Sequence, residues 1–532
     1  MKKTLAILLL VAAAAAARAG LLAPCADTAV SGAISGSMAA GRAYRLTAPG
    51  TYRGSLNYTR QNGKTGSAGL YFEDTGWYIP YEDLSGAAAE GAAIGPVAEE
   101  KPFVYNGRLY RQISPVKETA VPEKVFKTAD SRLGLGILKN GRLSLNVDFK
   151  RQYFRGASGF LCQAPDGLYA LDRAEFGKDS VVFSCPEINA RAEARFVPEG
   201  SRIKITGSLG PLDPALPCLA ETIAMHLALG PSLSESWRFM NDLTAVTVAD
   251  GQLQELCERP FGAPFFYPLA VMFPKSAGYA LALAAEPGSA PANISGSGHL
   301  GSFYAVFKAE NCKCGFSLSL SKTSPEWGMR EAFRDYADAH PECFSPSGSA
   351  ETAPEKQALE NNGSYGAVAG SFDGLSLREC MFARAMAYKR PVYCDTDKTG
   401  AAAIDAAAEA LAFGFIPRFS GDVPAAAKAY AAAAEKLQPL GWLPVPLASS
   451  NNPAVTTERF GDEKAEKYYL VCRNTTQKSQ PAAIRVFTLP SADVEVKEII
   501  HQNAVTARKG TVSTVLLPGE ALVFEVENKW NK

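Results

Sequence analysis

The hydrophobic and polar positions of the chain follow two periods, and one replaces the other near Ser324. Between residues 101 and 323 apolar and polar residues alternate, as in Leu143–Phe149 and Phe316–Leu320, and turn sequences such as Asn140-Gly141 separate these runs. Alternation predicts antiparallel strands with one face in a core. About 200 residues of this pattern predict a large antiparallel β-sandwich.

After Ser324 the apolar residues recur every three or four positions, which predicts an amphipathic helix from Pro325 to His340. Further helices are expected at 377–388, 401–413 and 423–438, with a short strand at 391–394. This order is typical of an α/β region. Alternation then returns and predicts five strands in a small C-terminal β-sandwich, beginning with Tyr468–Cys472.

These patterns predict a multidomain, mainly β protein with a short α/β centre. We expect these segments: a signal peptide at 1–19, a small β-rich module at 20–100, the large sandwich at 101–323, the helical and α/β region at 324–445, and the C-terminal sandwich at 446–532.

The N-terminus has the features of a secretory signal peptide. Lys2 and Lys3 precede the uncharged apolar run Leu5–Ala17, and Ala17-Arg18-Ala19 is a small-x-small cleavage signal. The run is shorter than a membrane span requires, and no later segment is long and apolar enough to span a bilayer. We expect an exported protein, periplasmic or extracellular, with lipidation of Cys25 as an open alternative.

Composition excludes several classes of function. The 532 residues include 54 basic and 54 acidic side chains, so there is no basic surplus for nucleic acid. Four histidines argue against a histidine metal centre, and the chain has no nucleotide-binding or serine-hydrolase motif, so we expect no metal and no cofactor. Among eleven cysteines, the close pair Cys312 and Cys314 is interpreted as alternating strand residues, one a small buried hydrophobe, and the disulfide pairing stays open.

Several stretches of sequence carry a resemblance to a known group of proteins. They are Ser324–Phe333, His340–Phe344, Ala385–Pro391, Ala410–Pro417, Leu437–Val445 and Glu458–Gly461. With the β, α/β, β order, they resemble secreted bacterial putative glycoside hydrolases, over about residues 120 to 530. The resemblance implies a large β-sandwich, a (β/α)₈ barrel and a small C-terminal β-domain.

The chain departs from that architecture in length. A complete barrel takes about 250 residues, whereas fewer than about 100 residues separate Phe344 from Leu437. What is present resembles only the last few βα units. The barrel is therefore expected to be truncated.

Carboxylates near the expected strand ends are the candidate catalytic residues, because glycoside hydrolysis generally needs two carboxyl groups across the scissile bond. They are Asp395, Asp397, Glu360 and Asp373. The alternative for Asp395-Thr396-Asp397 is that it caps the helix that begins near Gly400. Asn361 and Asn362 are candidates for contacting sugar hydroxyls, and the alternative is an ordinary turn.

Aromatic side chains are the second candidate chemistry, since apolar sugar faces stack on rings. Trp77 and Tyr78 are the candidate carbohydrate-binding pair, and the alternative is that they fill a small core. His226 is interpreted as a core residue, and Trp442 as packing between the α/β region and the last β-domain.

The favoured hypothesis is an exported protein of glycoside-hydrolase ancestry that associates with oligo- or polysaccharide through the sandwich surfaces, with weak catalysis or none. The alternatives are an active glycosidase with a carboxylate pair in the shortened centre, and a structural cell-envelope protein without a sugar site. The sequence leaves the sugar, the linkage and the oligomeric state open.

Overall fold

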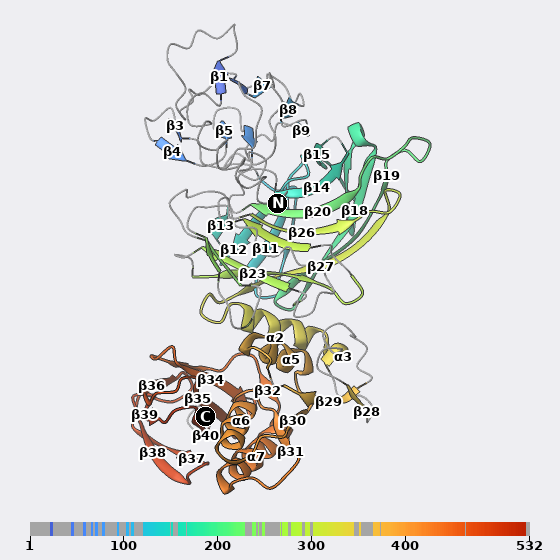
Figure 1. Ribbon diagram of the computed structural model, residues 1–532. Coiled ribbons are helices and arrows are strands. Elements are labelled where there is room, and N and C mark those ends of the chain that lie inside the picture. The colour runs from blue at the N-terminus through green and yellow to red at the C-terminus, as the bar shows by residue number, and fades with distance from the viewer. Residues whose placement is uncertain are drawn as a thin grey trace. The chain divides into compact units, whose positions relative to one another are not determined.

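The structure is a computed structural model, and most of what it describes lies after residue 120 (Figure 1). The described residues are 121–148, 150–152, 158–165, 167–228, 237–240, 243, 247–249, 267, 269–274, 278–289, 293–297, 302–344, 350–352, 365–372, 374–462 and 464–527. Before residue 121 only short strands are described, from β1 (Leu22–Pro24) to β9 (Arg108–Tyr110).

The chain divides into two compact units. The first ends at Pro325, and the second runs from Glu326 to the end and also includes the short segments Asp242–Ala245 and Gly262–Tyr267. Large antiparallel sheets dominate, so the predicted mainly β, multidomain fold is confirmed. The finer segment boundaries stay predictions.

The first unit is a β-sandwich built from sheets of four, seven and nine strands. The four-stranded sheet contains β10 (Lys124–Lys127), β11 (Leu133–Ile137), β12 (Leu143–Val147) and β13 (Lys150–Gln152). The seven-stranded sheet contains β8 (Phe103–Tyr105), β9, β14 (Gly159–Ala164), β15 (Gly167–Ala170), β20 (Thr222–Ala228), β25 (Asn293–Ser297) and β26 (Ser302–Lys308). The nine-stranded sheet contains β16 (Arg173–Phe176), β17 (Ser180–Cys185), β18 (Ala190–Glu199), β19 (Arg202–Pro211), β21 (Trp237–Met240), β22 (Thr247–Ala249), β23 (Leu269–Pro274), β24 (Ala280–Ala285) and β27 (Cys314–Thr323).

The core of this unit follows the predicted alternation. Along β18 Ala190, Ala192, Ala194 and Phe196 are buried while the residues between them are more exposed. The same period buries Leu143, Leu145 and Val147 on β12, because successive strand residues point to opposite faces.

His226 does not follow its predicted place in the core. It is half-buried on β20, whereas its neighbours Met225 and Leu227 are buried in the sandwich core. Because strand residues alternate, His226 lies on the other face of the sheet.

A disulfide joins Cys218 and Cys312, whose Cα atoms are 5.8 Å apart. It ties the loop after β19 to the turn before β27. Cys314 is a free, half-buried thiol at the first position of β27. The interpretation of Cys312 and Cys314 as alternating strand residues is therefore wrong, because the turn directs Cys312 to a partner 94 residues away in sequence.

The second unit begins with helices and a parallel sheet. Its helices are α2 (Met329–Ala339), α3 (Pro341–Phe344), α5 (Leu377–Ala387), α6 (Gly400–Ala412) and α7 (Ala425–Leu437), and a 3₁₀ turn, η3 (Gln438–Leu440), follows. The parallel strands are β28 (Ala350–Thr352), β29 (Tyr365–Ser371), β30 (Val392–Thr396) and β31 (Ile416–Phe419). Ser376 starts α5 with a capping box that includes Glu379.

The four parallel strands do not close into a barrel. Their order is β28-β29-β30-β31, so β28 and β31 are the two edges of the described sheet. Both edges are short, and β31 contains Pro417, which lacks the N–H group that a further strand would need. Among the described residues this sheet has four strands, half the number in a complete barrel. That it is a shortened barrel stays a prediction.

A buried arginine closes the C-terminal end of α5. Arg384 is 2% exposed and donates hydrogen bonds to the backbone carbonyls of Tyr388, Arg390 and Gly414. Burial, with a smaller contribution from the neighbouring charge of Arg390, lowers the pKa of Arg384 to about 9. A cation is well placed at this helix end, because the C-terminal carbonyls carry partial negative charge.

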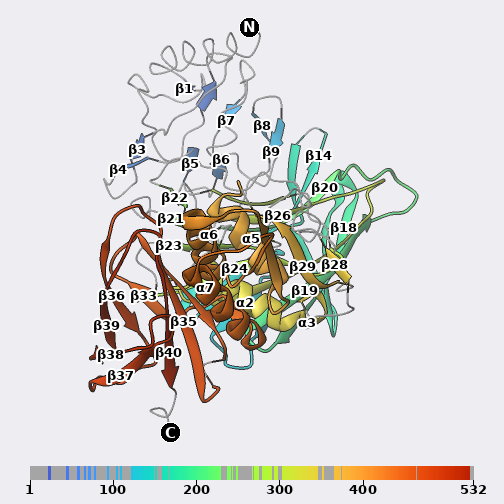
Figure 2. The same ribbon diagram turned by 60° about the horizontal axis from the view of Figure 1, so that its bottom comes forward.

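The C-terminal domain is a single curled nine-stranded antiparallel sheet, of which Figure 2 shows strands β36 to β40 side by side. Its strands are β32 (Trp442–Leu443), β33 (Ala448–Ser450), β34 (Val455–Phe460), β35 (Lys467–Asn474), β36 (Gln480–Val486), β37 (Val494–Glu498), β38 (Asn503–Arg508), β39 (Thr511–Leu516) and β40 (Ala521–Glu527). The five expected strands are present, and four others were missed. Two of those are only two and three residues long, too short for a periodic pattern.

Trp442 lies where the sequence placed it, between the α/β region and this domain. It is 1% exposed, its ring packs edge to face on Tyr388 after α5, and its indole N–H donates to Glu458 on β34 at 2.9 Å.

Candidate functional site

The carboxyl ends of the parallel strands bring a row of polar residues together. The register pairs Ser371 on β29 with Asp395 on β30, and Asp395 with Arg418 on β31. Register partners in neighbouring strands lie on the same face of a sheet, so these three residues form one row, called here the edge row. In barrels and other parallel α/β sheets this end of the strands is where binding and catalytic residues collect.

Within the edge row, Asp395 and Arg418 form a two-pronged ion pair. The Nε of Arg418 donates to Oδ1 of Asp395 at 2.6 Å, and Nη2 donates to Oδ2 at 3.1 Å. The two side chains are 47% and 41% exposed, respectively, so the pair is open to solvent. Such a fork fixes the plane of both groups.

Tyr393 lies on β30 two residues before Asp395, so its side chain is on the same face of the sheet as the edge row. The guanidinium of Arg418 lies 4.9 Å from the centre of the Tyr393 ring. Arg418 is therefore held both by a carboxylate and by an aromatic face. An aromatic ring, a carboxylate and a guanidinium thus meet at one place.

The other half of the expected acidic motif lies outside the edge row. Asp397 is exposed and follows β30 in the loop before α6. The alternative interpretation of Asp395-Thr396-Asp397 as a helix cap is wrong: the N-cap residue of α6 is Thr399, and no side chain bonds there. The Thr396 hydroxyl accepts from the Lys398 N–H at 3.3 Å, and the Asp395 carboxylate is engaged by Arg418.

The remaining site predictions are not tested by the described residues. Glu360, Asp373, Asn361 and Asn362 lie outside them. Trp77 and Tyr78 lie in the short strand β6 (Trp77–Ile79), which pairs with β5 (Leu70–Phe72), but their side chains are outside the description. These residues stay predictions.

Sequence reasoning missed Arg418 and Tyr393. Both belong to short apolar segments that end next to a turn, and neither is a carboxylate of the kind that glycoside hydrolysis requires. The position of Arg418 was nevertheless a usable signal. A charged residue at the carboxyl end of a short parallel strand lies at the edge where ligands bind in α/β sheets.

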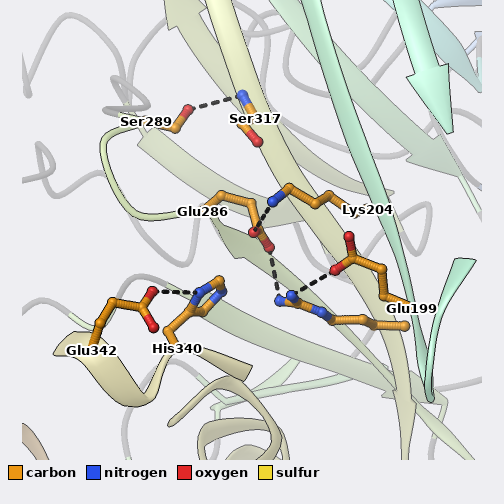
Figure 3. Close-up of polar contacts among 8 residues, drawn as sticks. Glu199, Lys204, Glu286, Ser289, Ser317, His340 and Glu342 are labelled. Atoms are coloured by element: carbon orange, nitrogen blue, oxygen red, sulfur yellow. Dashed lines mark hydrogen bonds and ion pairs between the residues drawn. The ribbon is translucent and has the colours of Figure 1, made fainter. Parts of the chain in front are cut away.

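The first unit contains a second polar cluster, which Figure 3 shows. Glu286, after β24, is 3% exposed and pairs with Arg202 at 3.0 Å and Lys204 at 3.2 Å, both on β19. Arg202 also pairs with Glu199 at 2.8 Å. Because the buried carboxylate is matched by cations from the same sheet, we interpret the cluster as structural.

Figure 3 also draws a contact in the second unit, where Nδ1 of His340 lies 3.5 Å from the carboxylate of Glu342 at the start of α3. Among the residues that the structure describes, no group of three or more His, Cys, Asp or Glu side chains could hold a metal ion. None of the described helices is long and apolar enough to cross a membrane.

Comparison with known proteins finds no matching family model and no matching curated protein. Among solved structures, a glycoside hydrolase family 97 enzyme in complex with acarbose, from Pseudoalteromonas sp. strain K8, is 8% identical with a TM-score of 0.35, over 76% of this chain and 100% of that chain. An alpha-mannosidase from Enterococcus faecalis V583 is 8% identical with a TM-score of 0.28, over 82% of this chain and 46% of that one.

An alpha-amylase from Anoxybacillus is 12% identical, with a TM-score of 0.24, over 39% of this chain and 57% of that one. At these TM-scores the likeness carries no argument about function. The function is therefore argued from the residues of this chain.

Proposed function

We propose that the protein is an exported carbohydrate-binding protein in which the edge row contacts a glycan without hydrolysing it. The observation that carries this proposal is the two-pronged pair between Asp395 and Arg418 at the carboxyl edge of the parallel sheet, with Tyr393 beside it. Carboxylate, guanidinium and aromatic groups together supply the hydrogen bonds and the apolar contact that sugars require. The sequence resemblance to glycoside hydrolases supports the same ligand class.

The absence of catalysis is supported by the chemistry of the candidate carboxylate. Hydrolysis generally requires a second carboxyl group facing the first across the scissile bond, and one of the two must carry a proton. Asp395 faces the Arg418 guanidinium instead, which donates to both of its carboxylate oxygens. A sheet of four strands also has half of the strand ends from which a complete barrel builds its active site.

Export is supported by two independent features. The N-terminal run has the features of a secretory signal, and the disulfide between Cys218 and Cys312 is of a kind that persists in oxidising compartments. Mass spectrometry of the protein secreted by a bacterial host tests the prediction, with a mature N-terminus at Gly20 as the expected result.

The test of function is a glycan array probed with the purified mature chain, combined with assays on aryl glycosides. Binding without hydrolysis is the expected result. Hydrolysis that is lost in Asp395→Asn would instead establish the glycosidase alternative. A chain that binds no glycan and hydrolyses none would leave the structural cell-envelope alternative.

A further inference from the structure

We infer that the edge row selects neutral glycans that present two adjacent hydroxyl groups, with the Asp395 carboxylate as their common acceptor. This inference rests on the proposed function and narrows it to one class of sugar. It follows from how the hydrogen-bonding capacity, the charge and the rigidity of the edge row are arranged.

The first step is the unused acceptor capacity of Asp395. A carboxylate has about four lone-pair sites, and Arg418 uses one site on each oxygen. The side chain is 47% exposed, so the remaining sites face solvent. Two neighbouring hydroxyl groups of a sugar ring can each donate to one carboxylate, whereas an isolated hydroxyl uses only one of these sites.

The second step is the charge balance at this edge of the sheet. The acids at the ends of β30 and β31 and in the loops that follow are Asp395, Asp397 and Asp422. The bases there are Lys398 and Arg418, and Lys428 lies next to them in the first turn of α7. Arg418 is paired with Asp395, and Lys428 is paired with Asp422. Among the described residues of this edge there is no surplus positive charge for an anionic sugar, so a carboxylated or sulfated glycan would meet Asp395 without compensation.

The third step is preorganisation. The Arg418 guanidinium lies over the Tyr393 ring while it forks onto Asp395, so the carboxylate plane is set before any ligand arrives. A group that is already held loses little side-chain freedom on binding. Replacing Arg418 with lysine keeps the charge but removes the planar fork.

The experiment measures the affinity of the purified mature chain for matched neutral and uronic-acid oligosaccharides by calorimetry. The variants are Asp395→Asn and Arg418→Lys, and the matched control is Asp422→Asn, which alters another exposed acid–base pair at the same edge. Each variant is first shown to melt within a few degrees of the wild type, as expected for exposed pairs.

The expected result is tighter binding of the neutral glycan, with affinity reduced about tenfold or more in Asp395→Asn, reduced less in Arg418→Lys, and unchanged in Asp422→Asn. Preferential binding of uronic-acid glycans, or an Asp395→Asn variant that binds as the wild type does, would overturn the inference while leaving a carbohydrate-binding function. No binding to any glycan would overturn the proposed function and the inference together.

Discussion

The Arg330 guanidinium on α2 holds the carboxylate of Glu458 on β34 with two N–H groups, at 2.7 and 3.0 Å. Glu458 is 3% exposed, and it also accepts the indole N–H of Trp442 at 2.9 Å. Arg330 donates further to the Pro444 carbonyl at 2.8 Å. One buried carboxylate therefore joins the first helix of the second unit to its C-terminal domain.

Removing the Glu458 charge should destabilise the second unit strongly. In Glu458→Gln the partly buried Arg330 loses its counter-ion, and breaking a buried pair in this way costs about 3 to 5 kcal/mol. Urea unfolding measures the change in the free energy of unfolding. The control is Lys428→Ala, whose pair with Asp422 is largely exposed, so the free energy of unfolding should change far less than in Glu458→Gln. Equal losses in the two variants would contradict a structural role for Glu458.

Removing the disulfide should lower stability in the oxidised protein only. The bridge between Cys218 and Cys312 closes a loop of 94 residues, and the chain-entropy estimate for a loop near that length is about 4 to 5 kcal/mol. We expect the double variant Cys218→Ser/Cys312→Ser to melt at a lower temperature and to be insensitive to dithiothreitol. The control Cys314→Ser retains the bridge and should respond to the reductant as the wild type does.

A methyl group at Gly414 should be poorly tolerated. Gly414 follows α6 with φ +65°, and the hydrogen bonds from Gly414 N–H to the Leu411 carbonyl and from Phe415 N–H to the Ala410 carbonyl form a Schellman motif. A Cβ there would lie 2.3 Å from the Phe460 ring. Gly414→Ala is expected to lower the free energy of unfolding by about 2 to 4 kcal/mol.

The control for this change is Gly421→Ala, because nothing lies within 4 Å of a Cβ built there. Chemical denaturation of both variants separates the local clash from a general effect of adding a methyl group. An unaffected Gly414→Ala protein would show that the ring of Phe460 moves aside without loss.

The stability of the second unit should fall in acid partly through Glu525. Burial raises the pKa of this carboxyl, but hydrogen bonds from Lys467 and Tyr469 and the positive charges of Lys467 and Lys436 outweigh it and hold the pKa below its ordinary value. A carboxyl with a lowered folded-state pKa contributes stability above its unfolded pKa, about 4.3, and loses it as the pH falls through the folded value.

Thermal melting between about pH 7 and pH 3 measures this contribution. Glu525→Gln should have a smaller decrease of melting temperature over this range than the wild type, because its side chain does not titrate. Glu435→Gln, which changes an exposed acid on α7, should follow the wild-type curve. Parallel curves for all three proteins would rule out a contribution from Glu525.

Much of the fold was predictable because local periodicity reports which side of an element is buried. The alternation along β18 and β19 and the spacing in α2 reflect one buried face each, and all three elements are present. A strand was also expected at 391–394, but it ended one residue before Asp395, which the structure places inside β30 (Val392–Thr396). The role of Asp395 was less accessible, since its partner Arg418 lies 23 positions further along the chain.

The sequence by itself determined the two periods, their change near Ser324 and the shortage of residues for a full barrel. Only the tertiary structure decided that four parallel strands stay open, that Cys312 bridges to Cys218, and that Asp395 pairs with Arg418 and does not cap α6. The physical reason is the separation of the contacting residues along the chain. Periodicity records which side of a single element is buried, whereas register, disulfides and ion pairs join residues that are far apart in sequence and meet only in the folded protein.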